Sequence, residues 1–208
     1  MKNPLIITIG REYGSGGREI GQALAKRLGI AYYDKEIITL AAKKSGLSDE
    51  FIASNEQRVR SSLIHNLAAS ASYHNGLFAG QYLPLSENIF IAQAQVIRDI
   101  AAKESAVIVG RCADYILEGR ENTINVFIHA PMEARVKRIM ALHHIDEGAA
   151  IKEINTSDKE RGNHYFRYTD MKWGKAQNYD LCVNSSLLGI EGTVEMLMDV
   201  AKIEERTL

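Results

Sequence analysis

Apolar residues along the chain gather in short unbroken runs, which alternate with longer stretches where they recur three or four residues apart. The short runs predict buried strands, and the longer stretches predict amphipathic helices that pack against them. Strands that alternate with helices in this way indicate an α/β protein with a parallel sheet. The predicted strands cover five segments: 5–9, 30–33, 106–109, 125–130 and 179–185.

The stretches with helical spacing set the domain organisation. Amphipathic helices are predicted over 20–28, 35–44, 86–100, 132–140 and 190–203. Residues 48–103 contain no strand pattern, so we expect an all-helical insertion there, in a core formed by residues 1–47 and 104–208. The charged segment 149–167 predicts a further helix that covers the core, with a short lid at about 155–175. A chain of 208 residues is long enough for one well-buried α/β domain.

A glycine-rich stretch joins the first predicted strand to the first predicted helix. Residues 10–19 read Gly-Arg-Glu-Tyr-Gly-Ser-Gly-Gly-Arg-Glu, with four glycines within eight residues. Glycines let the backbone turn tightly, and the following helix adds its unpaired N–H groups and the positive end of its dipole. The alternative is a flexible turn without a ligand. Because strand, turn and helix follow in the order of a phosphate-binding loop, we expect phosphate to bind at Gly14, Ser15, Gly16, Gly17, Arg18 and Glu19.

This loop differs from a standard P-loop in the residues that do the most direct chemistry. A P-loop ends in Gly-Lys-Ser/Thr, whose lysine contacts the β- and γ-phosphates and whose hydroxyl binds magnesium. Here Gly17 takes the place of the lysine, or Arg18 does if the alignment moves by one residue. The planar guanidinium of Arg18 suits phosphate oxygens, so Arg18 is the leading candidate to replace the lysine.

Two further candidate binding residues follow predicted strands. Asp34 ends the second strand, where it can cap the next helix, face a ligand, or do both. Arg111 follows the strand 106–109 directly after Gly110. The carboxyl ends of strands in open α/β sheets face the ligand, so we expect Arg111 to bind a phosphate or carboxylate, with a structural ion pair as the alternative.

Arg161 and Arg167 lie in the predicted cover helix, on either side of Gly162. They could close over a polyanion, or they could belong to an exposed helix with weak ion pairs. No metal-binding site is predicted, because the adjacent His143 and His144 point to different sides of a helix and no third ligand is suitably spaced. Cys112 is interpreted as a small buried residue.

Composition narrows the functional classes. The formal net charge is −1 with 25% charged residues, which gives no electrostatic argument for binding nucleic acid or an anionic membrane. Two cysteines cannot form a disulfide framework, so a reducing cytoplasm is the simplest location. No apolar run has the length of a transmembrane helix, and the N-terminal residues do not resemble a signal peptide.

Four stretches together resemble the cytidylate kinase-like family of P-loop nucleoside monophosphate kinases. They are Arg-Glu-Tyr-Gly-Ser-Gly-Gly-Arg-Glu-Ile-Gly at 11–21, Tyr-Asp-Lys-Glu at 33–36, Val-Gly-Arg at 109–111, and Lys-Trp-Gly at 172–174 followed by Asn-Tyr-Asp-Leu at 178–181. The resemblance implies a three-layer α/β/α fold with a five-stranded parallel sheet, a helical NMP-binding insertion and a short lid. It also implies ATP, Mg²⁺ and phosphoryl transfer to CMP or dCMP.

The resemblance also implies roles for individual residues. The glycine loop would hold the ATP phosphates, and Arg111 would hold the α-phosphate of the acceptor. Arg161 and Arg167 would neutralise the phosphoryl group in transit, and Arg18, as the replacement for the lysine, is the third candidate catalytic residue. Arginines that converge on the phosphates can suffice, because phosphoryl transfer requires positioning and charge stabilisation more than covalent help.

The chain departs from the family pattern on the acceptor side. The pattern of cytidylate kinases has Gly-Arg-Asp where this chain has Gly-Arg-Cys at 110–112, so an acidic residue is missing at Cys112. Asp114 lies two positions further on. After Asp34 the chain lacks a phosphate-binding arginine that the family pattern has, and Lys35 is the candidate to replace it. These departures leave two alternatives: a catalytically weak nucleotide-binding regulatory protein, or a kinase for a non-nucleotide small molecule.

Overall fold

A five-stranded parallel sheet forms the centre of the molecule. The computed structural model describes residues 3–37, 39–40 and 85–207. The strands lie in the order β2-β3-β1-β4-β5, which confirms the predicted parallel sheet. Their bounds are β1 (Ile6–Arg11), β2 (Ala31–Tyr33), β3 (Ala106–Val109), β4 (Thr123–His129) and β5 (Leu181–Asn184).

Helices join the strands and cover the sheet. Their bounds are α1 (Gly17–Leu28), α4 (Leu85–Lys103), α5 (Ala113–Ile116), α6 (Met132–His143), α7 (Glu147–Thr169), the short 3₁₀ helix η1 (Ala176–Asn178) and α8 (Ser185–Thr207). Most of the predicted insertion 48–103, and the end of the helix predicted over 35–44, lie outside the described residues. The last part of the insertion forms α4, as the helical spacing over 86–100 predicted.

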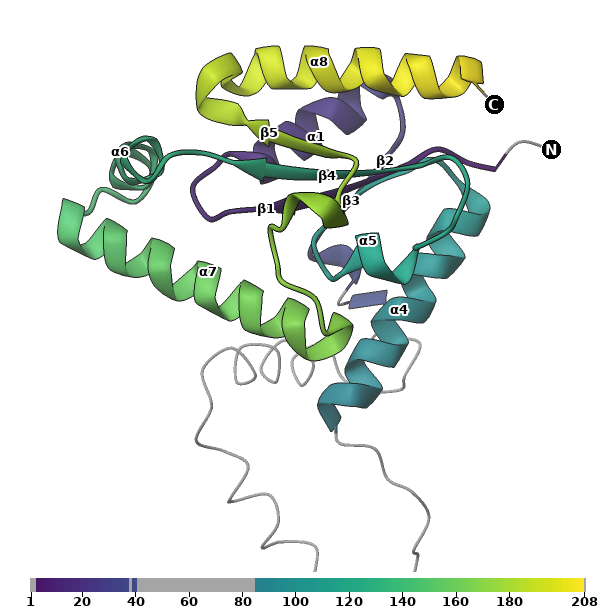
Figure 1. The fold of residues 1–208 in the computed structure, drawn as a ribbon, viewed down its shortest axis with the longest axis horizontal. Coiled ribbons are helices and arrows are strands. Elements are labelled where there is room, and N and C mark those ends of the chain that lie inside the picture. The colour runs from purple at the N-terminus through teal and green to yellow at the C-terminus, as the bar shows by residue number, and fades with distance from the viewer. Residues whose placement is uncertain (1–2, 38, 41–84, 208) are drawn as a thin grey trace, which may run out of the picture.

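Two apolar cores lie on opposite faces of the sheet, and they make the fold three-layered. On one face, Ile7 and Ile9 of β1 pack with Leu24 of α1 and Leu197 of α8. On the other face, alternate strand residues such as Ile108 pack with α4 and α5. Figure 1 shows α1 and α8 on one side of the sheet and α4 and α5 on the other. This arrangement confirms the predicted α/β/α fold, since a strand buried on both faces needs helices on both.

Helices α6 and α7 lie beyond the carboxyl ends of the strands and have a smaller core of their own. Helix α7 begins with Asp146, whose carboxylate accepts a hydrogen bond from the N–H of Ala149 at 2.8 Å. It is continuous over the charged segment that predicted a cover helix. Because parallel strands all end at one edge, the glycine loop, Asp34 and Gly110 meet there, beside α7.

Candidate phosphate-binding site

The glycine loop connects β1 to α1 as the sequence predicted. Gly14 and Gly16 have φ angles of 80° and 79°, and Gly17 is the first residue of α1. A side chain at Gly16 would be strained at this φ, and its Cβ would lie 2.5 Å from Cδ1 of Ile190. Position 16 therefore needs glycine for the backbone to turn from the loop into α1. The N-terminus of α1 offers N–H groups that have no partner within the helix, which suits phosphate oxygens.

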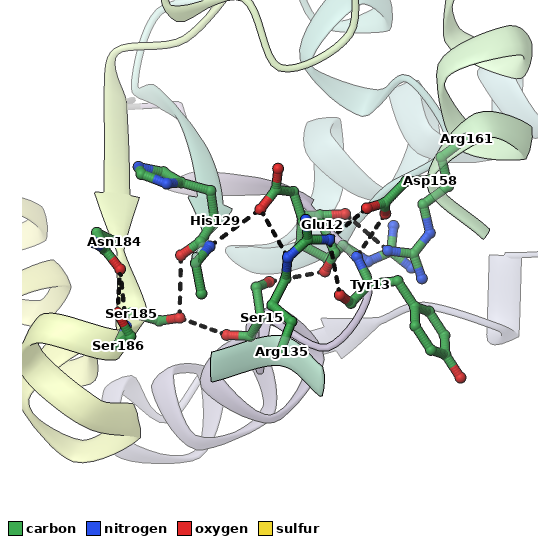
Figure 2. Close-up of polar contacts among 12 residues, drawn as sticks. Glu12, Tyr13, Ser15, His129, Arg135, Asp158, Arg161, Asn184, Ser185 and Ser186 are labelled. Atoms are coloured by element: carbon green, nitrogen blue, oxygen red, sulfur yellow. Dashed lines mark hydrogen bonds and ion pairs between the residues drawn. The ribbon is translucent and has the colours of Figure 1, made fainter. Parts of the chain in front are cut away.

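An ion-pair network holds the outer side of the loop, and Figure 2 shows its members converging there. We call Glu12, Arg135 and Asp158 the outer flank. Arg135 lies between the two carboxylates, with Nη1 2.5 Å from Asp158 Oδ2 and Nε 3.4 Å from Glu12 Oε2. The same carboxylates accept hydrogen bonds from the N–H groups of Tyr13, at 2.7 Å, and Ala130, at 3.1 Å. One arginine thus bridges two partly buried carboxylates that also bind backbone N–H groups, and these contacts fix the path of the loop.

Hydroxyl groups fix the loop from within (Figure 2). The Ser185 hydroxyl at the end of β5 donates to the carbonyl oxygen of Ser15 at 2.6 Å and lies 3.2 Å from the carbonyl oxygen of His129. The Ser15 hydroxyl donates to the carbonyl oxygen of Glu12 at 2.8 Å, and Ser15 is buried. The predicted phosphate-binding residue Ser15 thus directs its hydroxyl into the loop, which leaves the backbone as its means of contacting a phosphate.

Four arginines gather on the inner side of the loop, and we call Arg11, Arg18, Arg111 and Arg161 the arginine cluster. Asp34 lies among them and is buried. Its carboxylate oxygens are 2.9 Å from Nε of Arg18 and 3.7 Å from Nη2 of Arg11. Arg161 of α7 donates from Nη1 to the carbonyl oxygen of Arg11 at 2.8 Å, which joins the cover helix to the end of β1.

The surroundings of Arg11 in the arginine cluster disfavour its charged form. Burial, together with the nearby positive charges of Arg161 and Arg111, lowers the pKa of Arg11 to about 9, although Asp34 acts in the opposite direction. Positive charges held close together in a partly buried place are stabilised by an anionic ligand. This side of the loop is therefore suited to a group with several negative charges.

One cleft at this sheet edge brings together almost all of the predicted site residues. The exception is Ser15, which is buried within the loop. The cleft is lined by Gly14, Gly16, Gly17, Arg18, Glu19, Asp34, Lys35, Arg111, Arg161 and Arg167.

The structure gives several of these side chains partners within the protein. Glu19 pairs with Arg138 of α6. Arg167 contacts α4, where its Nη2 lies 2.7 Å from Glu87 Oε1 and 3.0 Å from the Ser86 hydroxyl. Arg18 pairs with Asp34, so the two predicted residues are brought together. Arg111 follows Gly110 in a turn where both have positive φ, 61° and 76°, which directs the chain away from β3 at the sheet edge.

Sequence reasoning missed Arg11, Glu12, Asp158 and Ser185 as site residues. Arg11 and Glu12 lie inside the glycine-rich stretch itself, so their position was a usable signal. Asp158 and Ser185 gave no local signal, because each meets the loop from a distant segment.

A partly buried carboxyl group, that of Asp114 in α5, lies on another side of the cleft. Asp114 lines the cleft, and its Oδ2 accepts a hydrogen bond from the Tyr165 hydroxyl at 2.7 Å. Burial raises the pKa of Asp114, and the bond from Tyr165 partly opposes that shift. Burial likewise raises the pKa of the Cys112 thiol to about 12, so this side chain is a neutral, buried residue, as predicted.

The loop fits a polyphosphate better than it fits a metal ion held by protein side chains. Its carboxylates are engaged by arginines: Glu12 by Arg135, Glu19 by Arg138, and Asp34 by Arg18. Among the residues that the structure describes, no three His, Cys, Asp or Glu side chains are grouped to bind a metal. The donors present therefore suit anionic oxygens, and they do not form a magnesium site by themselves.

A glycine loop between the first strand and first helix, at the edge of a parallel sheet with helices on both faces, agrees with a P-loop kinase fold. The cytidylate kinase-like family model matches residues 6–187, and the chain belongs to this family.

Relatives of this chain include several archaeal cytidylate kinases. The cytidylate kinase of Archaeoglobus fulgidus is 23% identical over 202 residues, which cover 96% of each chain. That of Methanocaldococcus jannaschii is 25% identical over 122 residues, 58% of this chain and 66% of the relative. A uronate isomerase of Corynebacterium glutamicum is 27% identical over 107 residues, but these are half of this chain and only 21% of that protein.

Solved structures agree on the fold. An uncharacterised protein from Eubacterium ventriosum has a TM-score of 0.70 at 27% identity, with 95% of this chain and 98% of that chain covered. A shikimate kinase from Bacteroides thetaiotaomicron has a TM-score of 0.55 at 12% identity, with 95% and 98% covered. In the described part of the chain, no helix combines the length and apolar character needed to cross a membrane.

Proposed function

We propose that the chain transfers the γ-phosphoryl group of ATP to a nucleoside monophosphate, with CMP or dCMP as the favoured acceptor. ATP would enter as its magnesium complex, as in other phosphoryl-transferring kinases. The choice of acceptor rests on the family and on the archaeal cytidylate kinases among the relatives.

The observation that carries the proposal is the meeting of the glycine loop and the arginine cluster at one sheet edge. Asp34 is the carboxylate that contacts Arg11 and Arg18 there, and Arg161 reaches the same place from α7. A donor and an acceptor phosphate that approach each other bring several negative charges together. Closely placed guanidinium groups lower the free energy of that encounter, and their fixed positions avoid reorganisation during transfer.

In this proposal, ATP and the acceptor bind to different parts of the cleft. The glycine loop would bind the phosphates of ATP, and Arg111 at the end of β3 would bind the α-phosphate of the acceptor. Asp34 and Lys35 follow strand β2 and line the cleft, and in this proposal they would bind the acceptor. Asp114, two positions after Cys112, also lines the cleft and would offer its carboxyl group to the base of the acceptor. Arg161 and Arg167 of α7 would close over the phosphoryl group.

A coupled assay for ADP tests the reaction. The purified protein is incubated with Mg-ATP and, separately, CMP, dCMP, UMP, AMP and GMP. We expect ADP formation that depends on CMP or dCMP. Absence of turnover with every monophosphate would reject the nucleotide-kinase proposal. Thermal-shift measurements with the same monophosphates, sugars and small alcohols would then separate a binding protein from a kinase with another acceptor, because a ligand of the native state raises its apparent stability.

Arg111→Met tests the placement of the acceptor. We expect the KM for the acceptor to rise about tenfold or more, because a charged hydrogen-bond donor to phosphate is lost. The dissociation constant of ATP should stay within about twofold of wild type, because the glycine loop would bind ATP and Arg111 would bind the acceptor. A twofold change corresponds to well under 1 kcal/mol. An equal loss of ATP affinity would place Arg111 on the donor side.

A further inference from the structure

Arg11 is the last residue of β1, the middle strand of the sheet, and its side chain lines the cleft. A Cβ placed on Gly17 would lie 2.5 Å from Cβ of Arg11, so the stem of the arginine passes beside the first residue of α1. A Cβ placed on Gly110 would lie 2.2 Å from Nη1 of Arg11, so the guanidinium lies against the turn after β3. Arg11 thus reaches from the glycine loop towards Arg111.

Both glycines leave the space that this side chain occupies. Gly110 has a φ of 76°, so a side chain there would be strained as well as blocked by the guanidinium. Gly17 has no such positive φ, and a Cβ there would lie 2.5 Å from Cβ and 3.0 Å from Cγ of Arg11, closer than to Cβ of Ile128 at 3.3 Å. The backbone on either side is thus shaped around Arg11.

The charges around Arg11 favour an added anion. The side chain is 20% exposed, and its nearest carboxylate, Asp34, is 3.7 Å away and has its other oxygen 2.9 Å from Arg18. Arg161 and Arg111 repel the Arg11 guanidinium, and the pKa of Arg11 is lowered to about 9, first by burial and then by these charges. A phosphate group beside Arg11 would offset both the repulsion and the lost hydration.

Arg18, which the sequence favours as the replacement for the P-loop lysine, has a different setting. Its side chain is 52% exposed, and its Nε is held by Asp34. Arg11 is the more buried of the two, and its guanidinium lies against Gly110 in the way just described.

We propose that Arg11 contacts the phosphoryl group in transit between ATP and the acceptor and so takes the part of the lysine that this P-loop lacks. The inference rests on the proposed use of ATP, and it does not depend on which acceptor is correct. Arg18 then holds Asp34, and Asp34 in turn positions Arg11. Because Arg11 extends towards the acceptor side, it contacts the γ-phosphate of ATP and leaves the β-phosphate to the backbone of the loop.

The test is a comparison of ATP and ADP affinity in the absence of any acceptor. Arg11→Met keeps most of the length of the stem and removes the guanidinium, and the bond from Arg161 survives because it ends on the backbone of Arg11. In calorimetric titrations with magnesium present, we expect wild type to bind ATP more tightly than ADP. Arg11→Met should weaken ATP binding about tenfold or more, with a much smaller effect on ADP, because a charged hydrogen bond to the γ-phosphate is lost.

Two further variants make the comparison specific. Lys137→Met removes an exposed charge that pairs with Glu133 on α6, and it should leave both affinities unchanged. Arg18→Met should weaken the preference for ATP less than Arg11→Met does. If Arg11→Met does not fold by circular dichroism, Arg11→Gln replaces it, with the same expectation.

Each remaining outcome has a definite meaning. Equal losses for ATP and ADP would show that Arg11 only shapes the loop, and an unchanged preference for ATP would show that it does not reach the γ-phosphate; either result overturns the inference. The same holds if wild type binds ATP no more tightly than ADP, or if Arg18→Met alone removes the preference. Loss of the preference in Arg11→Met, in a protein that phosphorylates no monophosphate, would support Arg11 and reject only the proposed acceptor.

Discussion

The two sides of the glycine loop use arginine in opposite ways. On the outer flank, Arg135 lies between Glu12 and Asp158, and each carboxylate also accepts a backbone N–H. In the arginine cluster, Arg11 has Asp34 at 3.7 Å and is repelled by neighbouring arginines. In the first arrangement the protein itself supplies the anionic partners of the arginine. The second has an excess of positive charge that an anion would offset. Burial of an arginine therefore does not by itself identify a binding residue.

The difference follows from the work that each side does in the proposed mechanism. A loop that orients phosphates has to be rigid, and matched charges that also satisfy backbone N–H groups provide rigidity. A site that stabilises developing negative charge needs positive groups that are already in place. The same glycine-rich stretch supplies residues to both sides, because Arg11 and Glu12 are neighbours in the sequence and lie on opposite sides of the loop.

The largest expected effect on stability comes from the outer flank. Arg135→Met should lower the free energy of unfolding by about 3 kcal/mol, because it leaves two partly buried carboxylates without their shared cation. Urea denaturation of the ligand-free protein measures this change. Lys137→Met on the same helix removes an exposed pair and should have almost no effect. Similar stability of the two variants would mean that the outer flank does not hold the loop.

The next effect separates the two arginines of α7. Arg161→Met should lower kcat about 100-fold or more, because a positive group at the phosphates is lost. Arg167→Met should lower kcat less, since Arg167 pairs with Glu87 of α4 in the structure. Steady-state kinetics with Mg-ATP and the accepted acceptor give both values. Equal losses would indicate that Arg167 leaves Glu87 and joins the cluster when substrates bind.

A smaller effect is expected where the loop is held by a hydroxyl group. Ser185→Ala should lower the free energy of unfolding by about 1 kcal/mol, because the carbonyl oxygen of Ser15 loses its hydrogen bond. Ser186→Ala is the matched control. The Ser186 hydroxyl donates to Asn184 at an exposed position, so its loss should change stability little. A larger loss in the control would remove the argument that Ser185 braces the loop.

The smallest expected effect is a change in pH dependence. Burial raises the pKa of Asp114 above its ordinary value of 3.8, so the native state holds this proton more tightly than the unfolded state. As pH rises from 3.8 to the higher native pKa, Asp114 therefore makes the free energy of unfolding fall. Asp114→Asn should remove that decrease. Denaturation of both proteins across this range measures the difference, and parallel curves would contradict the pKa shift.

The predicted fold was confirmed because its signals are local. Buried runs such as 106–109 identify strands without help from the rest of the chain, and the alternation of strands with helices restricts the topology to a parallel sheet. The glycine loop was also visible locally, since a strand, several glycines and a helix follow one another. The order β2-β3-β1-β4-β5 was not predicted, because neighbours in a parallel sheet are far apart in sequence.

The sequence alone determined the fold class, the place of the glycine loop and the sheet edge at which the candidate residues meet. Tertiary structure decided which arginine lies between two carboxylates and which lies among other positive charges. Arg135 meets Asp158 of α7, and Arg11 meets Gly110 after β3. Such pairings join distant segments, and the free energy of a charge depends on burial and on its neighbours in space. For that reason the sequence favoured Arg18 as the replacement for the P-loop lysine, and the structure favours Arg11.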